Sequence, residues 1–315
     1  MSNFSFLSPS WPVLAELGEL AERNLYIDPN TSLIKLRMFS EVMAKYLLAY
    51  EKIEEPVDGA QISRINMLSN SGLIPERLLP LFHSLRKVGN KATHEVFGTI
   101  ESAQTHMQFA FRLSTWFRQT YGKGDFTPQE FALPQKSLLD TQHLIALNEE
   151  LQRRSKKWEE DYNRLQVELE ALKIVDVTAE SKTIRRKLSA RVANQIHLSE
   201  AETRLLIDEQ LNAAGWLADS QDIRYSKEAR PEKGLNKAIA EWPTFSGPSD
   251  YALFIGMDLV GVVEAKKKTK DVVSDLLQAK RYATDIEIKG EEKLVGGPWG
   301  NYKVPFLFAT NGRPY

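Results

Sequence analysis

Hydrophobic residues recur at three- and four-residue spacing along the first third of the chain. Between Trp11 and Tyr121 most leucine, isoleucine, valine, methionine and phenylalanine positions follow this spacing, which is the period of a helix with one buried face. A segment containing proline and glycine, residues 122–136, interrupts the pattern. We therefore predict an all-α bundle as the first domain, over residues 1–122.

Beyond the bundle, apolar residues recur at an interval of seven, which aligns one stripe along a helix. They are Leu144, Leu151, Trp158, Leu165 and Leu172. The residues three positions after Leu151, Trp158 and Leu165 would complete the apolar seam of a coiled coil, but they are the charged residues Arg154, Asp161 and Glu168. A single long helix is therefore expected rather than a dimerising coiled coil. We assign residues 123–191 to a linker and a helical arm.

The third region, residues 192–315, has mixed periodicity. Ser199 followed three residues later by Glu202 has the form of a capping box, and a helix is expected from there to Gly215. A short strand is expected near Asp222–Tyr225, followed by a loop rich in proline and glycine that leads to Asp250. The fold class is therefore α+β and multidomain: a helical bundle, a helical arm, and a domain with a central mixed sheet flanked by helices.

Two apolar runs on either side of Gly256-Met257-Asp258 predict a β-hairpin. With Met257 at the centre of the loop, the opposed pairs are Ile255 with Leu259, Ala252 with Val262, and Asp250 with Glu264. Opposed residues project to the same side of a sheet, with Cβ atoms roughly 4.5–5.5 Å apart.

Two carboxylates in such positions repel each other unless a cation lies between them. The hard oxygen ligands of Asp250, Glu264 and the Ala265 carbonyl suit Mg²⁺, and Lys266 emerges on the same face, two residues beyond Glu264. Such a site would activate water against a phosphodiester. The alternative is a surface hairpin whose acidic residues are solvated.

A helix from Asp271 to about Ile286 and a strand from Val304 to Ala309 are expected after the hairpin. Gln278 and Tyr282 are four positions apart and so share one face of this helix, either facing the site or packing on the sheet.

Composition narrows the chemistry further. The chain has no cysteine and a formal net charge of −1, which excludes thiolate metal sites and any general polycationic surface. Basic residues cluster locally, and we predict contacts with DNA phosphates for Lys182, Arg185, Arg186, Lys187 and Arg191, and for Lys267, Lys268 and Lys270. The alternative for either cluster is a solvated face. No signal peptide or membrane span is evident, so a cytoplasmic protein without membrane partners is expected.

Asp250, thirteen intervening residues and then Glu264-Ala265-Lys266 resemble the PD-(D/E)xK nuclease signature. Ser249 stands where that signature has proline, and because proline is no metal ligand this difference matters little. Gln278 with Tyr282 resembles the Gln-x-x-x-Tyr element of Type I restriction subunits and RecB-like nucleases. The sequence from Asp28 to Phe39 and the sequence from Phe308 to Tyr315 also resemble Type I restriction (motor) subunits. Glu202 is a candidate for an additional acid near the metal.

This resemblance implies an N-terminal fragment that cuts double-stranded DNA with Mg²⁺. It also implies modification and specificity subunits as partners. No phosphate-loop motif is present, so ATP would act only through a motor region absent from this chain. Two alternatives remain open: a DNA- or protein-binding adaptor with a degenerate nuclease fold, and a free-standing defence nuclease.

The helical bundle resembles a domain at the head of Type I restriction subunits that is distantly similar to HEPN ribonucleases. Seven residues separate Arg86 from His94, more than the ribonuclease pattern has. We therefore predict a structural role, with His94 hydrogen-bonded inside the bundle and Asn90 in a capping turn, and no ribonuclease activity.

Overall fold

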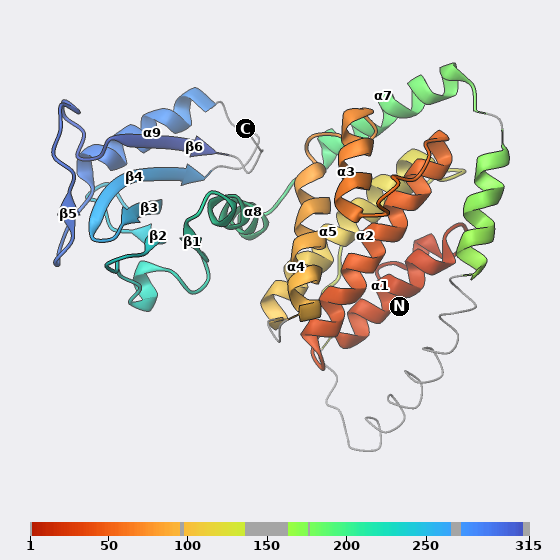
Figure 1. The fold of residues 1–315 in the computed structure, drawn as a ribbon, viewed down its shortest axis with the longest axis horizontal. Helices are drawn as coiled ribbons and strands as arrows, with labels where there is room; N and C mark the ends of the chain where they lie inside the picture. The colour runs from red at the N-terminus through yellow and green to blue at the C-terminus, as the bar shows by residue number, and fades with distance from the viewer. Residues whose placement is uncertain (1, 95–97, 136–162, 176, 266–271, 311–315) are drawn as a thin grey trace. The chain divides into compact units, whose positions relative to one another are not determined.

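The computed structural model describes residues 2–94, 98–135, 163–175, 177–265 and 272–310, with backbone only for 272–276. The chain divides into two compact units, residues 1–196 and 197–315. The protein is α+β: the first unit is helical and the second contains a six-stranded mixed sheet with helices (Figure 1). The predicted fold class is therefore confirmed.

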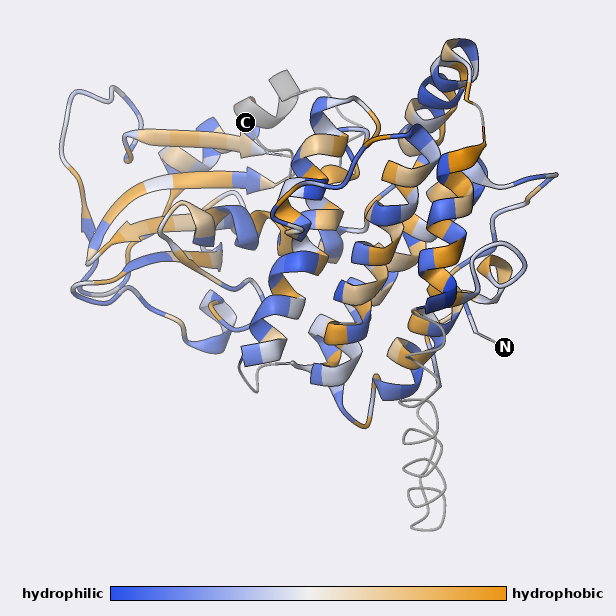
Figure 2. Cartoon of the chain, turned by 45° about the vertical axis from the view of Figure 1, so that its right-hand side comes forward, coloured by the Kyte–Doolittle hydropathy of each residue, from blue (hydrophilic) through white to orange (hydrophobic). Residues whose placement is uncertain are grey.

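The first unit contains the predicted bundle. Its elements are η1 (Ser5–Leu7), α1 (Pro12–Asn24), α2 (Pro29–Glu51), α3 (Gln61–Asn70), α4 (Leu79–His94), α5 (Ile100–Tyr121), a helix over residues 163–174, and α7 (Ala179–Gln195). Local chemistry sets the helix starts: Asp28 caps α2 by accepting from the Thr31 amide, and Thr99 caps α5 by accepting from the Ser102 amide. The hydrophobic stripes of the helices meet inside the unit (Figure 2).

Two later helices pack against this bundle. In residues 163–174, Leu165 and Leu169 are buried, and the Tyr46 hydroxyl donates to Glu168 at 2.6 Å. Helix α7 lies on α5, where the Trp116 indole donates to the Ser189 hydroxyl at 3.1 Å. The bounds of the predicted arm, 123–191, stay a prediction because much of it lies outside the described residues.

The second unit has a sheet between two helices. Its elements are α8 (Glu200–Ala213), β1 (Leu217–Ala218), η2 (Tyr225–Lys227), β2 (Asn236–Trp242), β3 (Ser249–Ile255), β4 (Asp258–Ala265), α9 (Val272–Asp285), β5 (Lys293–Leu294) and β6 (Phe306–Thr310). Strands β2, β3 and β4 are antiparallel neighbours, β1 runs parallel to β2, and β5 and β6 both run parallel to β4.

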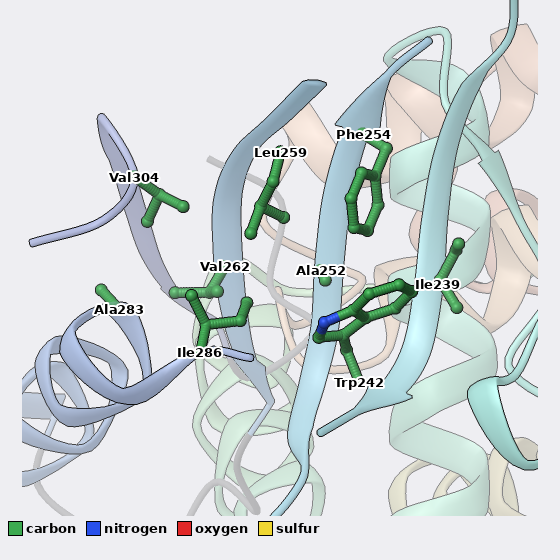
Figure 3. Packing of buried hydrophobic residues seen from close by; sticks show 9 residues of the cluster. All are labelled: Ile239, Trp242, Ala252, Phe254, Leu259, Val262, Ala283, Ile286 and Val304. Atoms are coloured by element: carbon green, nitrogen blue, oxygen red, sulfur yellow. The ribbon is translucent and has the colours of Figure 1, made fainter. Parts of the chain in front are cut away.

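Side chains alternate between the two faces of this sheet, so each face has its own core. The core on the α9 face is shown in Figure 3 and contains Ile239, Trp242, Ala252, Phe254, Leu259, Val262, Ala283, Ile286 and Val304. The core on the α8 face contains Ile207, Ala218, Ala238, Ala240, Tyr251, Leu253, Val260 and Val263. Because both faces are covered, β3 and β4 read as nearly continuous apolar runs.

Two sequence expectations for this unit were wrong. No strand forms over Asp222–Tyr225; Arg224 makes an isolated bridge to Ala240, and a 3-10 helix follows. The expected loop before the hairpin instead contains β2, which pairs with β3 along its length. The capping box at Ser199 and Glu202 is confirmed.

Candidate active site

The strand directions bring several strand ends together. Asp250 is the second residue of β3, and Glu264 is the next-to-last residue of β4, which is antiparallel to β3. Strand β6 runs parallel to β4 and places Ala309 beside Glu264. Strand β2 also ends here, at Trp242 opposite Ser249. One end of the sheet therefore holds the predicted pair of acidic residues.

The hairpin register is confirmed where it matters for this pair and differs near the turn. Ala252 faces Val262 as predicted, and Tyr251 faces Val263, so the same register extended by one residue sets Asp250 opposite Glu264. Near the turn, however, Ile255 faces Asp258 and not Leu259.

A tighter turn and a bulge explain the difference. The turn has two central residues, Gly256 and Met257, and Gly256 adopts a φ of 59°, as the first central residue of a type II′ turn does. Val260 is the additional residue in the ladder between Leu259 and Gly261. The bulge restores the predicted register for the rest of the hairpin.

Both oxygens of the Asp250 carboxylate are hydrogen-bonded. Oδ2 accepts from the Ala265 amide at 2.7 Å, and Oδ1 lies 3.2 Å from Nη2 of Arg204 on α8. The side chain of Asp250 is 18 % exposed. It is therefore a partly accessible carboxylate with a defined orientation, joined to the end of β4.

Glu264 is buried, at 1 % exposure. It lies two positions after Val262, whose side chain belongs to the α9 face of the sheet, so strand alternation puts Glu264 on that same face. A charged carboxylate in so apolar a place requires compensation from a hydrogen-bonding group or a cation. Lys266, the remaining member of the predicted catalytic set, lies outside the described residues.

The donors at this end of the sheet fit a hard divalent cation. Asp250 and Glu264 supply carboxylate oxygens and Ala265 a carbonyl, the ligand types that Mg²⁺ takes while keeping several waters. Within the described ranges there is no group of three or more His, Cys, Asp or Glu side chains that could hold a metal. The proposed ligands include only two such side chains, Asp250 and Glu264, together with a backbone carbonyl. That finding on groups of three or more side chains therefore does not test this site.

An arginine network for which the sequence gave no motif surrounds Asp250. Arg204 also contacts Glu241 at 2.9 Å and Glu200 at 3.2 Å, and Arg224 lies 3.4 Å from Glu241. We call Arg204, Glu200, Glu241, Asp250 and Arg224 the Arg204 network. Burial alone would lower the pKa of Arg204, but Glu241, Asp250 and Glu200 together raise it. Apart from Glu200, four positions before it on α8, the partners of Arg204 are distant in sequence, so no local motif reveals the network.

Helix α9 brings Gln278 and Tyr282 together. The Gln278 amide donates to the Tyr282 hydroxyl at 2.7 Å, and Tyr282 is 9 % exposed. Ala279 and Ala283, on the same helix, are completely buried. The predicted shared face is therefore present, on a helix that packs against β4 and β6.

Glu202 is also completely buried. Its carboxylate accepts from the Ser199 amide at 2.6 Å, while its own amide donates to the Ser199 hydroxyl at 3.2 Å. The capping box accounts for this acid, and a part in metal binding stays a prediction.

A second acid on α8 has a perturbed ionisation. Asp208 accepts from the amide and hydroxyl of Ser220, at 2.8 and 2.7 Å, and from the Tyr251 hydroxyl at 2.9 Å. Burial raises the pKa of Asp208 to about 6 against the lowering effect of these hydrogen bonds. The same burial, with Asp208 nearby, raises the pKa of Tyr251.

The basic cluster on α7 divides into two groups. Lys182 donates to the Glu51 carbonyl at 2.7 Å and Arg185 contacts the Glu51 carboxylate at 2.8 Å, so both join α7 to the bundle. Three members are exposed: Arg186, Lys187 and Arg191. DNA contact by any of the five stays a prediction, and Lys267, Lys268 and Lys270 lie outside the described residues.

The Arg86–His94 pair does not form the arrangement expected from its sequence. His94 is exposed at the end of α4, and Asn90 lies inside that helix, so neither the buried histidine nor the capping turn is present. Among the histidines that the structure describes, the buried one is His106, which is 2 % exposed and lies 3.0 Å from the Ser84 hydroxyl. A turn was expected at Asn90, but helix α4 continues through it from Lys87 to Lys91. The helix continues because the apolar spacing persists to Ala92.

No helix among the described residues is long and apolar enough to cross a membrane.

Comparison with known proteins connects this fold to a restriction system. Residues 217–315 match the family model described as the second domain of the Type I restriction enzyme EcoKI endonuclease subunit. The whole chain aligns at 32 % identity with the Type I restriction enzyme EcoKI endonuclease subunit of Escherichia coli (strain K12). The chain spans 33 % of the length of that relative. No solved structure matches the chain. Across its whole length, therefore, the chain is similar to the endonuclease subunit of a Type I restriction enzyme.

Proposed function

We propose that residues 197–315 form a metal-dependent endonuclease that hydrolyses phosphodiester bonds of double-stranded DNA. The observation that carries the proposal is the position of Asp250 and Glu264 on adjoining strand ends, with Asp250 hydrogen-bonded to the Ala265 amide. The match of this same unit to an endonuclease-subunit domain supports it.

Each residue of the site has a distinct part in this proposal. Asp250, Glu264 and the Ala265 carbonyl would hold Mg²⁺, which when bound polarises the phosphodiester and lowers the pKa of a coordinated water. Lys266 would orient the attacking water or stabilise charge that develops on the phosphate. Gln278 and Tyr282, as a hydrogen-bonded pair on α9, would contact DNA or the groups around the metal.

The larger assembly is part of the same proposal. The relative is much longer than this chain, which spans 33 % of it, and ATP-driven movement along DNA would belong to a motor region outside these 315 residues. Specificity subunits would recognise the DNA sequence. Modification subunits would protect the host DNA. The exposed α7 residues and Lys267, Lys268 and Lys270 would contact phosphates without reading sequence.

Plasmid nicking with Mg²⁺ and calorimetric Mg²⁺ titration test the site together. Asp250→Ala and Glu264→Ala should each abolish cutting and metal binding, because each removes a ligand. Lys266→Ala should keep metal binding and lose cutting, because the ammonium acts on charge in the transition state. The assembled enzyme is used if the chain alone does not cut, and ATP-driven movement should then survive all three changes.

A matched control lies on the same hairpin. Asp258 is an exposed carboxylate at the turn end of β4, away from Asp250, and Asp258→Asn should cut like the wild type. Full cleavage by the Glu264→Ala protein would place the active site elsewhere. Metal-independent DNA binding with no cutting by the wild-type assembly would instead favour an adaptor with a degenerate nuclease fold.

A further inference from the structure

We propose that Arg204 is a positioning residue that aims the Asp250 carboxylate at the end of β4. The inference rests on the proposed nuclease function and adds a residue from α8 that no motif contains. Arg204 lies 46 positions before Asp250 in sequence, so only the fold brings them together.

The carboxylate of Asp250 is held at both of its oxygens. Arg204 Nη2 lies 3.2 Å from Oδ1 of Asp250, and the Ala265 amide donates to Oδ2 at 2.7 Å. With one oxygen held from α8 and the other from β4, rotation of the carboxylate about its last bond would break both contacts. The Oδ2 atom is thereby kept on the side of β4, the strand that carries Glu264.

Arg204 is itself held firmly. Its side chain is 15 % exposed and contacts Glu241 through Nη1 at 2.9 Å and Glu200 through Nη2 at 3.2 Å. Its backbone carbonyl accepts from the Tyr251 hydroxyl at 3.3 Å. A planar guanidinium can satisfy several carboxylates in one fixed arrangement, which an ammonium group cannot do.

Backbone strain marks Glu241, a non-glycine residue with a φ of 54°. Such a conformation costs on the order of 1–3 kcal/mol and persists where its surroundings determine it. It interrupts strand alternation: Ile239 and Trp242 are three positions apart yet join the same core on the α9 face. This strained residue, just before the end of β2, contacts Arg204.

The charges around Arg204 balance. Glu241 is shared by Arg204 and Arg224, and Glu200 also contacts Arg204. These two guanidinium groups and two carboxylates have no net formal charge. These four groups can therefore hold Asp250 in place without adding net positive charge against a bound cation.

Replacing Arg204 should separate cleavage from metal binding. Arg204→Ala should lower the cleavage rate by about 10- to 100-fold, because small misplacement of a reacting group costs about that much. Its Mg²⁺ affinity, measured by calorimetry without DNA, should be unchanged or tighter, because the group removed is a cation. Arg204→Lys should stay close to Arg204→Ala in cleavage, since it restores charge without the guanidinium geometry.

Arg224→Ala is the matched control. It removes a guanidinium from the same network, one that lies 3.4 Å from the Glu241 carboxylate. It should cut within about threefold of wild type, since an ion pair this accessible contributes little. Thermal unfolding of each variant establishes that the fold is intact, and Arg204→Lys decides the matter if Arg204→Ala does not fold.

Wild-type cleavage by both Arg204 variants would overturn the inference. A fall in the Mg²⁺ affinity of Arg204→Ala as large as that of Asp250→Ala would also overturn it, because Arg204 would then be needed to build the metal site. Failure of the nuclease proposal is distinguishable: either the wild-type assembly does not cut, or Asp250→Ala or Glu264→Ala cuts like the wild type.

Discussion

Replacing Asp208 by asparagine probes a buried acid on the α8 face of the sheet. The carboxylate accepts from the amide and hydroxyl of Ser220 and from the hydroxyl of Tyr251. An asparagine oxygen can accept from Ser220, and its amide can donate to the Tyr251 oxygen. The substitution therefore keeps the size and the main contacts while it removes the ionisation.

The magnitude follows from the shifted pKa. Burial raises the pKa of Asp208 from 3.8 to about 6, a difference that corresponds to about 3 kcal/mol. Because the folded pKa is above the unfolded value, the group contributes stability that is fully present below pH 3.8. That stability is lost as pH rises through about 6. Asparagine does not titrate, so it avoids this loss.

Urea unfolding between about pH 4 and about pH 8 measures the effect as a difference between two proteins. The stability of Asp208→Asn relative to wild type should rise with pH by up to about 3 kcal/mol, mostly between about pH 4 and about pH 6. Other titrating groups cancel in the difference. Asp222→Asn, at an exposed carboxylate paired with exposed Lys227, should show no such trend. A relative stability of Asp208→Asn that stays flat or falls with pH would refute the reasoning.

Three further outcomes are expected. Replacing Arg186, Lys187 and Arg191 together by glutamine should weaken DNA binding without changing thermal unfolding. Binding titrations at several salt concentrations should show that the slope of log K against log salt concentration falls by about 0.9 for each phosphate that is no longer neutralised. The helical bundle should not cut structured or single-stranded RNA, and cleavage that disappears in His94→Ala would contradict this. Ser199→Ala should lower the unfolding free energy by about 1 kcal/mol, because the capping box is removed; urea unfolding measures the difference.

Local and periodic signals were sufficient for much of the protein. The spacing of apolar residues predicted the helical bundle, since tertiary packing buries the stripe that the spacing creates. Ser199 and Glu202 predicted the start of α8 because a capping box is made by neighbours in sequence. The pairing of Ala252 with Val262 followed from a turn close in sequence. Opposed positions for Asp250 and Glu264 follow from that register.

Other features depended on partners that are distant in the sequence. Strand β2 has no hairpin signal, and it forms because β3 offers it a ladder. The bulge at Val260 changes the pairing next to the turn, and its effect is seen only in the ladder. His94, predicted inside the bundle, is exposed, while His106 is buried, because packing between helices decides which helical residues are covered.

The sequence by itself determined the secondary structure of the bundle, the hairpin and the pair of acids at one end of it, because each depends on neighbours or on a simple period. Tertiary structure alone decided the surroundings of that pair. Arg204 reaches Asp250 from another layer, and Glu241 adopts its strained conformation at the end of a strand that only sheet pairing creates. Side chains brought together by packing of separate elements leave no spacing in the sequence, so their contacts appear only when the chain is folded.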